Sequence, residues 1–284
     1  MNAAPSRDAT VRPRLMAVLA HPDDESLGFG GTLAAYASRG CDVHLLTATR
    51  GEGGRYREFR PGEPGHPGSA ALAEIREAEL RAAARVLGIR EVSLLNYRDQ
   101  HLDRADAREA VGAIAMHFRR VRPDVVLTFG PDGAYGHPDH IAISQFTTAA
   151  IVAAAAPRSA EPSAGSGPPH LVSKLYYLAW PSSTWDAYQS VFKTLVSTID
   201  GVERRAVPWP DWAITTVLDT RAVSQTVLRA VSCHVSQVSV YERLQTAPAD
   251  VQDGLWGCQY FYRVCSAVNG GRVRETDLFE GIDS

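Results

Sequence analysis

Short apolar runs alternate with helical patterns along the first half of the chain, and this alternation constrains the fold more than any other feature. Four apolar runs predict buried strands, at residues 16–20, 43–48, 92–95 and 125–129. Apolar residues at helical spacing predict helices at residues 27–38, 71–87, 106–121 and 137–155. Strict alternation of this kind predicts an α/β fold: a mostly parallel, twisted sheet with helices on both faces, in a Rossmann-like arrangement.

The second half of the chain has a weaker pattern. Aromatic and β-branched runs predict strands at residues 175–180, 213–218 and 259–264, and a helix at residues 220–234. We expect residues 1–14 to be a flexible N-terminus and residues 15–284 to form a single α/β domain. Within it we expect a motif-bearing core, a mobile linker rich in Pro, Gly and Ser, and a C-terminal appendage that completes the substrate pocket, over residues 15–156, 157–170 and 171–284.

Composition excludes several classes of partner. The chain has 284 residues, enough to bury a sizeable core without disulfides. Its 29 basic and 32 acidic residues give a net charge of −3, which argues against a nucleic-acid partner. No apolar stretch is long enough to cross a bilayer, and the N-terminus lacks the apolar run of a secretory signal. We therefore expect a cytoplasmic protein without membrane insertion. Its four cysteines form no CxxC pair, so they predict no structural zinc site.

Polar, Gly-rich segments follow the ends of the four predicted strands. They cover residues 21–25, 49–54, 97–103 and 129–140. In open parallel sheets, ligands bind beyond the carboxyl ends of the strands, so these segments predict the position of the site.

The first of these segments, His21-Pro22-Asp23-Asp24-Glu25, concentrates charge. Three carboxylates in a row repel one another and need a cation or a hydrogen-bonding network to offset that repulsion. An ordinary alternative is the solvated first turn of a helix, where acidic residues are favoured. The segment alone leaves both interpretations open.

A second cluster, at His137, Asp139 and His140, favours a metal site. The two histidines are three residues apart at a predicted helix start, and they therefore share one face. With the first cluster they supply what a catalytic zinc requires: three nitrogen or oxygen ligands and an open position for water. The remaining acidic and imidazole groups could act as base and acid.

Together the two clusters resemble a known family. The segments AHPDDESLGFGGTLA (residues 20–34) and GPDGAYGHPDHIA (130–142) are similar to those of the LmbE-like, PIG-L-type zinc N-deacetylases. The resemblance spans residues 15–150, with a weaker echo at residues 234–237, His-Val-Ser-Gln. Either motif alone is moderately specific, and the pair in this order is highly specific.

The resemblance implies a role for each polar side chain of the two clusters. It implies one zinc ion per chain, held by His21, Asp24 and His140. It also implies that Asp23 is the general base and that His137 stabilises or protonates the tetrahedral intermediate. Asp139 would orient His137, and Tyr135 would assist the oxyanion.

The resemblance also implies substrate contacts. Arg76 would bind the polar substrate, and Glu52 and Asp99 would accept sugar hydroxyls. Gly28 departs from the serine that some relatives carry in this turn, so a contact from that side chain is absent.

The function that follows is hydrolysis of an N-acyl amide on an amino-sugar-like or glycoconjugate substrate, with the N-acetyl group the first expectation. The alternative is an amidase that cleaves a larger acyl group from a thiol conjugate or a natural-product intermediate. A His2Asp site could also take iron, cobalt or manganese, and a homo-oligomer is possible. A glycan-binding protein without activity is disfavoured because Asp23 and His137 are both present. A dinucleotide-binding loop at residues 28–31 is disfavoured because Leu33 stands where the fingerprint needs glycine.

Two groups of side chains have two interpretations each. The arginines of the loop at residues 50–68 either are solvated or form a rim that recognises an anionic group of the substrate; they are Arg50, Arg55, Arg57 and Arg60. The tryptophans either pack in the core or line the acyl pocket; they are Trp180, Trp185, Trp209, Trp212 and Trp256.

Overall fold

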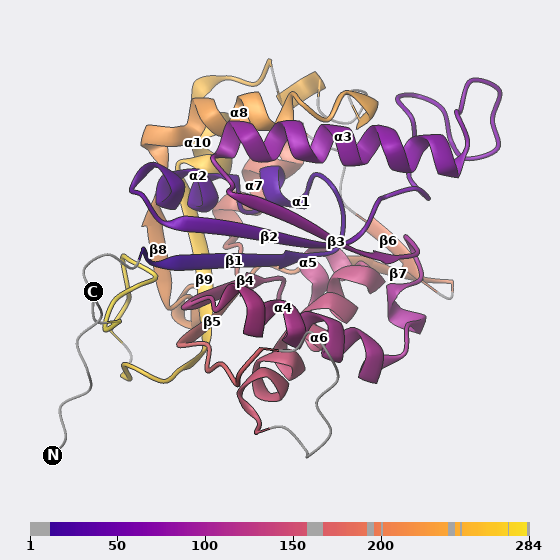
Figure 1. Ribbon diagram of the computed structural model, residues 1–284. Helices are drawn as coiled ribbons and strands as arrows, with labels where there is room; N and C mark the ends of the chain where they lie inside the picture. The colour runs from indigo at the N-terminus through magenta and orange to yellow at the C-terminus, as the bar shows by residue number, and fades with distance from the viewer. Residues whose placement is uncertain are drawn as a thin grey trace, which may run out of the picture.

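The structure is a computed structural model, shown in Figure 1. It describes residues 12–157, 167–191, 196–199, 201–237, 242–244, 246–271 and 273–282. Most of the expected flexible N-terminus and of the expected mobile linker lies outside these residues. Among the described residues, no helix is long and apolar enough to cross a membrane.

A seven-stranded sheet, in the order β3-β2-β1-β4-β5-β9-β8, forms the centre of the molecule. Its first five strands are parallel. They are β1 (Arg14–Leu19), β2 (Asp42–Thr49), β3 (Glu91–Tyr97), β4 (Val125–Thr128) and β5 (Lys174–Leu178). The central strands β1, β2 and β4 are almost wholly buried, as near-continuous apolar runs covered on both faces must be. The predicted parallel α/β sheet is confirmed.

The C-terminal part of the chain extends the same sheet. Strand β9 (Cys258–Ser266) pairs antiparallel with β5, and β8 (Thr216–Asp219) pairs antiparallel with β9. The strands predicted at residues 175–180, 213–218 and 259–264 therefore exist, with ends displaced by one to three residues. A separate two-stranded hairpin, β6 (Val196–Ile199) and β7 (Val202–Arg205), was not predicted.

Helices cover both faces of the sheet (Figure 1). One face carries α2 (Gly30–Ser38), α3 (Ser69–Leu87) and α8 (Ser224–Val231), and the other carries α4 (Ala107–Val121) and α6 (Pro138–Ala155). Two helices that the sequence did not predict, α7 (Ser182–Val191) and α10 (Ala249–Trp256), pack with α8 around a second apolar cluster. Short 3-10 turns lie at Leu102–Arg104, Asp211–Ala213, Arg221–Val223 and Val235–Gln237.

The helix predicted at residues 27–38 is wrong in its start, because the chain forms two helices there. Helix α1 (Asp24–Leu27) ends before Gly28, and α2 begins at Gly30. Phe29 turns into the core against Phe129, with ring centroids 5.5 Å apart. The side chain of Gln259 bonds the backbone on both sides of the break, donating to the Gly28 carbonyl and accepting from the Thr32 amide. A distant side chain thus provides hydrogen-bond partners for backbone groups on both sides of the helix break.

The order of the strands fixes where a ligand can bind. The chain proceeds from β1 outward to β2 and β3, and then returns to β4 on the other side of β1. This reversal places a crevice between the carboxyl ends of β1 and β4. The two predicted clusters directly follow these two strands. Helix α5 (Gly133–Gly136) connects β4 to α6 along this edge.

A buried polar cluster lies at the start of β5, at the opposite edge of the sheet. Lys174 is fully buried, and its ammonium lies 2.8 Å from a carboxylate oxygen of Glu275. Glu275 also accepts hydrogen bonds from Tyr176, Thr216 and Arg263. A buried charge is tolerated only when it is paired in this way.

Candidate metal centre

The fold brings the two predicted clusters together. His21 follows β1 and His140 lies in the first turn of α6, 119 residues later, yet His21 Nδ1 is 3.2 Å from His140 Nε2. His140 stacks on the Phe129 ring at a centroid distance of 3.9 Å. Both imidazoles are buried, so this contact is part of the packed interior and not an incidental contact between surface side chains.

Asp24 completes a triangle of donor atoms. Its Oδ1 lies 3.3 Å from His140 Nε2, and its Oδ2 lies 3.7 Å from His21 Nδ1. Oδ2 also accepts hydrogen bonds from the backbone amides of Ala20 and His21, which fix the carboxylate in place. Burial alone would raise the pKa of Asp24, but the two imidazoles hold it well below its usual value.

The three donor groups fit a zinc ion. Zinc bonds of 2.0–2.1 Å in a tetrahedral site place neighbouring ligand atoms roughly 3.3 Å apart. The two imidazole nitrogens are 3.2 Å apart, and Asp24 places one oxygen 3.3 Å from His140 and the other 3.7 Å from His21, which are separations of that size. Two imidazole nitrogens and a carboxylate are also the donor set of a catalytic site with an open fourth position. These residues can therefore hold a zinc ion, and their assignment as its ligands stays a prediction.

Two further carboxylates lie behind His21. Asp99 Oδ1 and Asp139 Oδ2 are 3.1 and 3.2 Å from His21 Nε2, the ring nitrogen that faces away from His140 and Asp24. Asp139 also accepts from the amides of Gln100 and Leu102. Burial would lower the pKa of His21, but these hydrogen bonds and charges raise it well above its usual value. A carboxylate behind a ligating imidazole is a common outer contact that fixes ring orientation.

Two residues make contacts that their predicted roles do not include, and those roles stay predictions. Asp99 is predicted to accept sugar hydroxyls; it lines the pocket, and its carboxylate also contacts His21 and the amide of Gly53. Asp139 is predicted to orient His137. Its carboxylate instead faces His21, and only its backbone amide contacts His137.

His137 is held as a neutral donor. It caps the start of α6, where its Nδ1 accepts the backbone N–H of Asp139 at 3.2 Å. Because Nδ1 is an acceptor, the ring proton is assigned to Nε2. Burial and the neighbouring imidazoles of His21 and His140 lower the pKa of His137 to about 3. A neutral ring with a free Nε2–H can donate a hydrogen bond to a ligand.

Asp23 lies beside the triangle and is held by Arg76. Its Oδ2 is 3.0 Å from Arg76 Nη2, and the same guanidinium donates to the carbonyls of Pro22 and Gly51. Arg76 is only 5% exposed, because helix α3 directs it inward from the face that packs beside the site. Arg76 thus lines the pocket and also fixes a candidate catalytic group, while its predicted contact with the substrate stays a prediction.

Tyr135 and Glu52 take different positions. Tyr135 lines the pocket, 5.5 Å from the His140 ring between centroids. Burial and the nearby charge of Asp24 raise the pKa of Tyr135 well above its usual value, so the hydroxyl stays protonated. Glu52 is not among the lining residues, and its carboxylate accepts from the backbone amide of Asp99.

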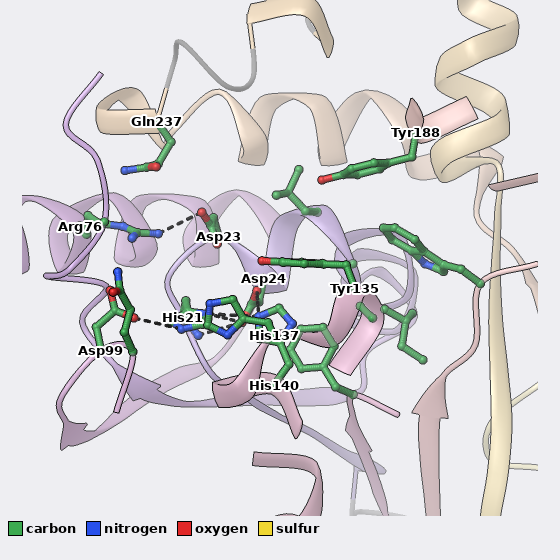
Figure 2. A pocket seen from close by; sticks show the side chains of 18 residues that line it. His21, Asp23, Asp24, Arg76, Asp99, Tyr135, His137, His140, Tyr188 and Gln237 are labelled. Atoms are coloured by element: carbon green, nitrogen blue, oxygen red, sulfur yellow. Dashed lines mark hydrogen bonds and ion pairs between the residues drawn. The ribbon is translucent and has the colours of Figure 1, made fainter. Parts of the chain in front are cut away.

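A cavity of about 240 Å³ opens over these groups. Figure 2 shows Arg76, Asp99 and Gln237 at one end of it and Tyr188 at the other, with His21 and His140 between them. The apolar members of its wall are Leu27, Phe129, Ala134, Leu178, Trp180 and Tyr188. The pocket therefore has a polar end at Arg76, Asp99 and Gln237 and an apolar end at the rings of Tyr188 and Trp180, whose centroids are 5.2 Å apart, with the candidate metal centre in the middle.

Comparison with known proteins gives the family. A family model described as PIG-L, GlcNAc-PI de-N-acetylase, matches residues 16–151. A 1D-myo-inositol 2-acetamido-2-deoxy-alpha-D-glucopyranoside deacetylase from Kineococcus radiotolerans is 35% identical over 310 residues, which cover 95% of this chain and 83% of the relative. The chain belongs to the PIG-L family. The deacetylase of the same name from Rhodococcus jostii is 34% identical and covers 95% of this chain and 98% of its own length.

A solved structure shares the fold of this PIG-L family member. The N,N'-diacetylchitobiose deacetylase from Pyrococcus horikoshii superposes with a TM-score of 0.63 at 20% identity, over 88% of this chain and 83% of that one. The family resemblance predicted from the two motifs is confirmed.

Several residues of the PIG-L pocket were not predicted from the sequence. Gln237 lines the pocket and belongs to the His-Val-Ser-Gln segment, which resembles the family but carried no predicted role. Tyr188 and Gln100 also line the pocket, and no motif marked them. Of the five tryptophans only Trp180 lines this pocket, and Trp212 is 87% exposed.

The arginine-rich loop stays at the periphery. Arg50 bonds Glu77 and Asn96, and none of the four loop arginines is among the residues lining the pocket. Gly54 and the carbonyl of Arg55, which accepts from Gln237, bring the loop backbone to the pocket edge instead. These contacts favour a solvated role for the loop side chains.

Proposed function

We propose that this protein hydrolyses the N-acetyl amide of an amino-sugar substrate and releases a free amine and acetate, using a bound zinc ion. The observation that carries the proposal is one pocket with three groups converging on its middle. They are a His2Asp donor triangle, a carboxylate beside it, and a neutral imidazole with a free N–H. Metal-dependent amide hydrolysis needs these parts.

His21, Asp24 and His140 would hold the zinc ion. When bound, zinc polarises the amide carbonyl and makes water acidic enough to deprotonate near neutral pH. The other divalent ions considered from the sequence have the same charge and accept the same donors.

Asp23 is the general base of this proposal. It takes a proton from the attacking water, and Arg76 fixes the orientation of its carboxylate through the 3.0 Å contact. Asp23 then returns the proton to the departing amine. His137 is unsuited to that transfer, because its Nδ1 accepts a backbone N–H and its ring carries only the Nε2 proton.

His137 and Tyr135 stabilise the negative charge that develops on the carbonyl oxygen. Both line the pocket, and each offers a protonated donor. Donors of this kind act mainly in the transition state, and loss of one commonly costs about 2.7–4 kcal/mol.

The two ends of the pocket orient the substrate. Sugar hydroxyls suit the polar end near Gln100 and Gln237, and the acyl group suits the apolar end near Tyr188 and Trp180. The names of the relatives support an N-acetylglucosaminyl-inositol as the sugar. The apolar end also favours a second candidate, an amidase that cleaves a larger acyl group. A cytoplasmic location, a homo-oligomer and the absence of a nucleic-acid partner stay predictions.

An amine-release assay tests the proposal. The zinc-loaded protein is offered 1D-myo-inositol 2-acetamido-2-deoxy-alpha-D-glucopyranoside, N-acetylglucosamine, and their analogues with longer acyl groups. We expect His140→Ala to lose zinc and activity together, and Asp23→Ala to keep zinc and lose about 10²- to 10⁴-fold in kcat. Near-normal kcat in Asp23→Ala would show that the base is assigned wrongly.

A further inference from the structure

A buried acid–imidazole pair lies directly behind the candidate base. Glu25 is 0% exposed and His234 is 1% exposed. Glu25 Oε1 is 2.8 Å from His234 Nε2 and accepts the Ser26 hydroxyl at 2.6 Å. The two partners are 209 residues apart, on α1 and in the turn after α8.

The second oxygen of Glu25 faces the backbone of the base. Glu25 Oε2 accepts the N–H of Asp23 at 2.9 Å. Asp23 has φ 109° and ψ −26°, a left-handed conformation that a residue with a side chain rarely adopts. Such a backbone is strained and persists only where its surroundings enforce it. The hydrogen bond that the Asp23 N–H donates to Glu25 is one of those constraints.

We infer that Glu25 and His234 are positioning residues that hold Asp23 in its strained backbone and so aim its carboxylate at the reacting water. This inference rests on the proposed function, because it takes Asp23 to be the base. Arg76 fixes the side chain of Asp23 from one side, and the Glu25–His234 pair fixes its backbone from the other. Neither Glu25 nor His234 lines the pocket, so both act through Asp23.

The Glu25–His234 pair contributes little to stability for the free energy that its burial costs. Among the described residues, His234 Nδ1 is buried and has no hydrogen-bond partner. An unsatisfied buried polar atom is costly, and a buried ion pair is often no more stabilising than apolar side chains of the same volume. The geometry of Glu25 therefore supports a positioning role, because Glu25 binds His234 with one oxygen and the backbone amide of Asp23 with the other.

A double-mutant cycle tests this inference. The variants Glu25→Ala, Glu25→Gln, Asp23→Ala and the double Asp23→Ala/Glu25→Ala are compared for kcat, KM and zinc content. We expect Glu25→Ala to lower kcat about 10- to 100-fold, the size of a small misplacement of a catalytic group. KM should change less than about threefold, and zinc content should not change. Glu25→Gln keeps an acceptor for the Asp23 amide and should retain most of kcat. In the Asp23→Ala background, loss of Glu25 should cost no further kcat.

A second pair of variants covers the case in which Glu25→Ala does not fold. His234→Gln places an amide N–H near the position of Nε2 and should keep kcat, while His234→Leu should lower it. The control is Glu275→Gln, which alters another buried, charge-paired carboxylate at the far edge of the sheet. It should lose stability and keep kcat.

The outcomes separate this inference from the proposed function. If Glu25→Ala lowers kcat by the same factor in the parent and in Asp23→Ala, the inference is overturned, while Asp23 remains the proposed base. A kcat in Glu25→Ala and in His234→Leu no lower than in Glu275→Gln also overturns it. A normal kcat in Asp23→Ala overturns the proposed base and, with it, the inference.

Discussion

Asp99→Asn distinguishes a carboxylate that binds substrate from one that supports a metal ligand. The sequence places Asp99 at the sugar hydroxyls, and the structure places it 3.1 Å from His21 Nε2. The substitution keeps the shape of the side chain and removes its charge. If the structural position is the functional one, the main effect is on metal affinity.

The size of that effect follows from the contacts of His21. Outer-shell partners of metal-ligating histidines are typically worth 10- to 100-fold in metal affinity or activity. His21 Nε2 has two such partners, and Asp139 at 3.2 Å remains in the variant. The neutral amide oxygen of asparagine can also still accept. We therefore expect the lower end of the range, about tenfold weaker zinc binding, which is about 1.4 kcal/mol.

Zinc affinity is measured by competition with a chromophoric chelator, and kcat and KM are measured with saturating zinc. The matched control is Asp103→Asn, an exposed carboxylate four residues further along the chain. At saturating zinc, KM for Asp99→Asn should lie within about threefold of the parent value. A zinc Kd within twofold of the parent, together with a KM raised tenfold or more, would refute the reasoning and restore the role in substrate binding.

Three other predictions concern stability and the metal. Gly88 ends α3 with φ 75°, and an added Cβ would lie 2.9 Å from the Cβ of Ala37. Gly88→Ala should therefore lower the free energy of unfolding, measured by urea denaturation, by about 1–3 kcal/mol. Burial alone would raise the pKa of Glu275, but hydrogen bonds, first of all from Lys174, lower it to about 2. Because the pKa is lower in the folded than in the unfolded state, the charged Glu275 contributes its full stabilisation above pH 4.5 and loses it as the pH falls toward 2. The difference in unfolding free energy between the parent and Glu275→Gln should therefore shrink over that range, and a constant difference would contradict the assignment. A strong chelator should abolish amine release and lower Tm, and added zinc should restore both; activity unchanged by exhaustive chelation would exclude a metal role.

The sequence predicts the strands well because their signal is local. A parallel strand covered on both faces must be a run of apolar residues, and β1, β2 and β4 are such runs. The end of the helix predicted at residues 71–87 is likewise found at Leu87, where Gly88 meets a local requirement for a left-handed backbone. The meeting of His21 and His140 could be predicted because both follow strands whose carboxyl ends share one edge.

What the sequence does not predict depends on distant side chains. The break between α1 and α2 is stabilised by Gln259, more than 200 residues away, and no window of local sequence contains that information. Asp99 turns to His21 because the segments after β1 and β3 converge beyond the sheet edge. Tyr188 enters the pocket from α7, a helix whose apolar spacing is ordinary and whose sequence carries no motif.

Charge balance gives a physical reason for a cation at the candidate metal centre. Asp24, Asp99 and Asp139 are each less than a tenth exposed, and each lies within 3.3 Å of an imidazole nitrogen. Three buried carboxylates beside two imidazoles carry an excess of negative charge, and burial makes that excess costly. The Arg76 guanidinium already bonds Asp23. A divalent ion would offset the excess, and His21, His140 and Asp24 would hold it. Zinc, cobalt, manganese and ferrous iron meet this charge requirement equally, so charge does not distinguish them, and the choice among them would depend on geometry, ligand type and metal availability.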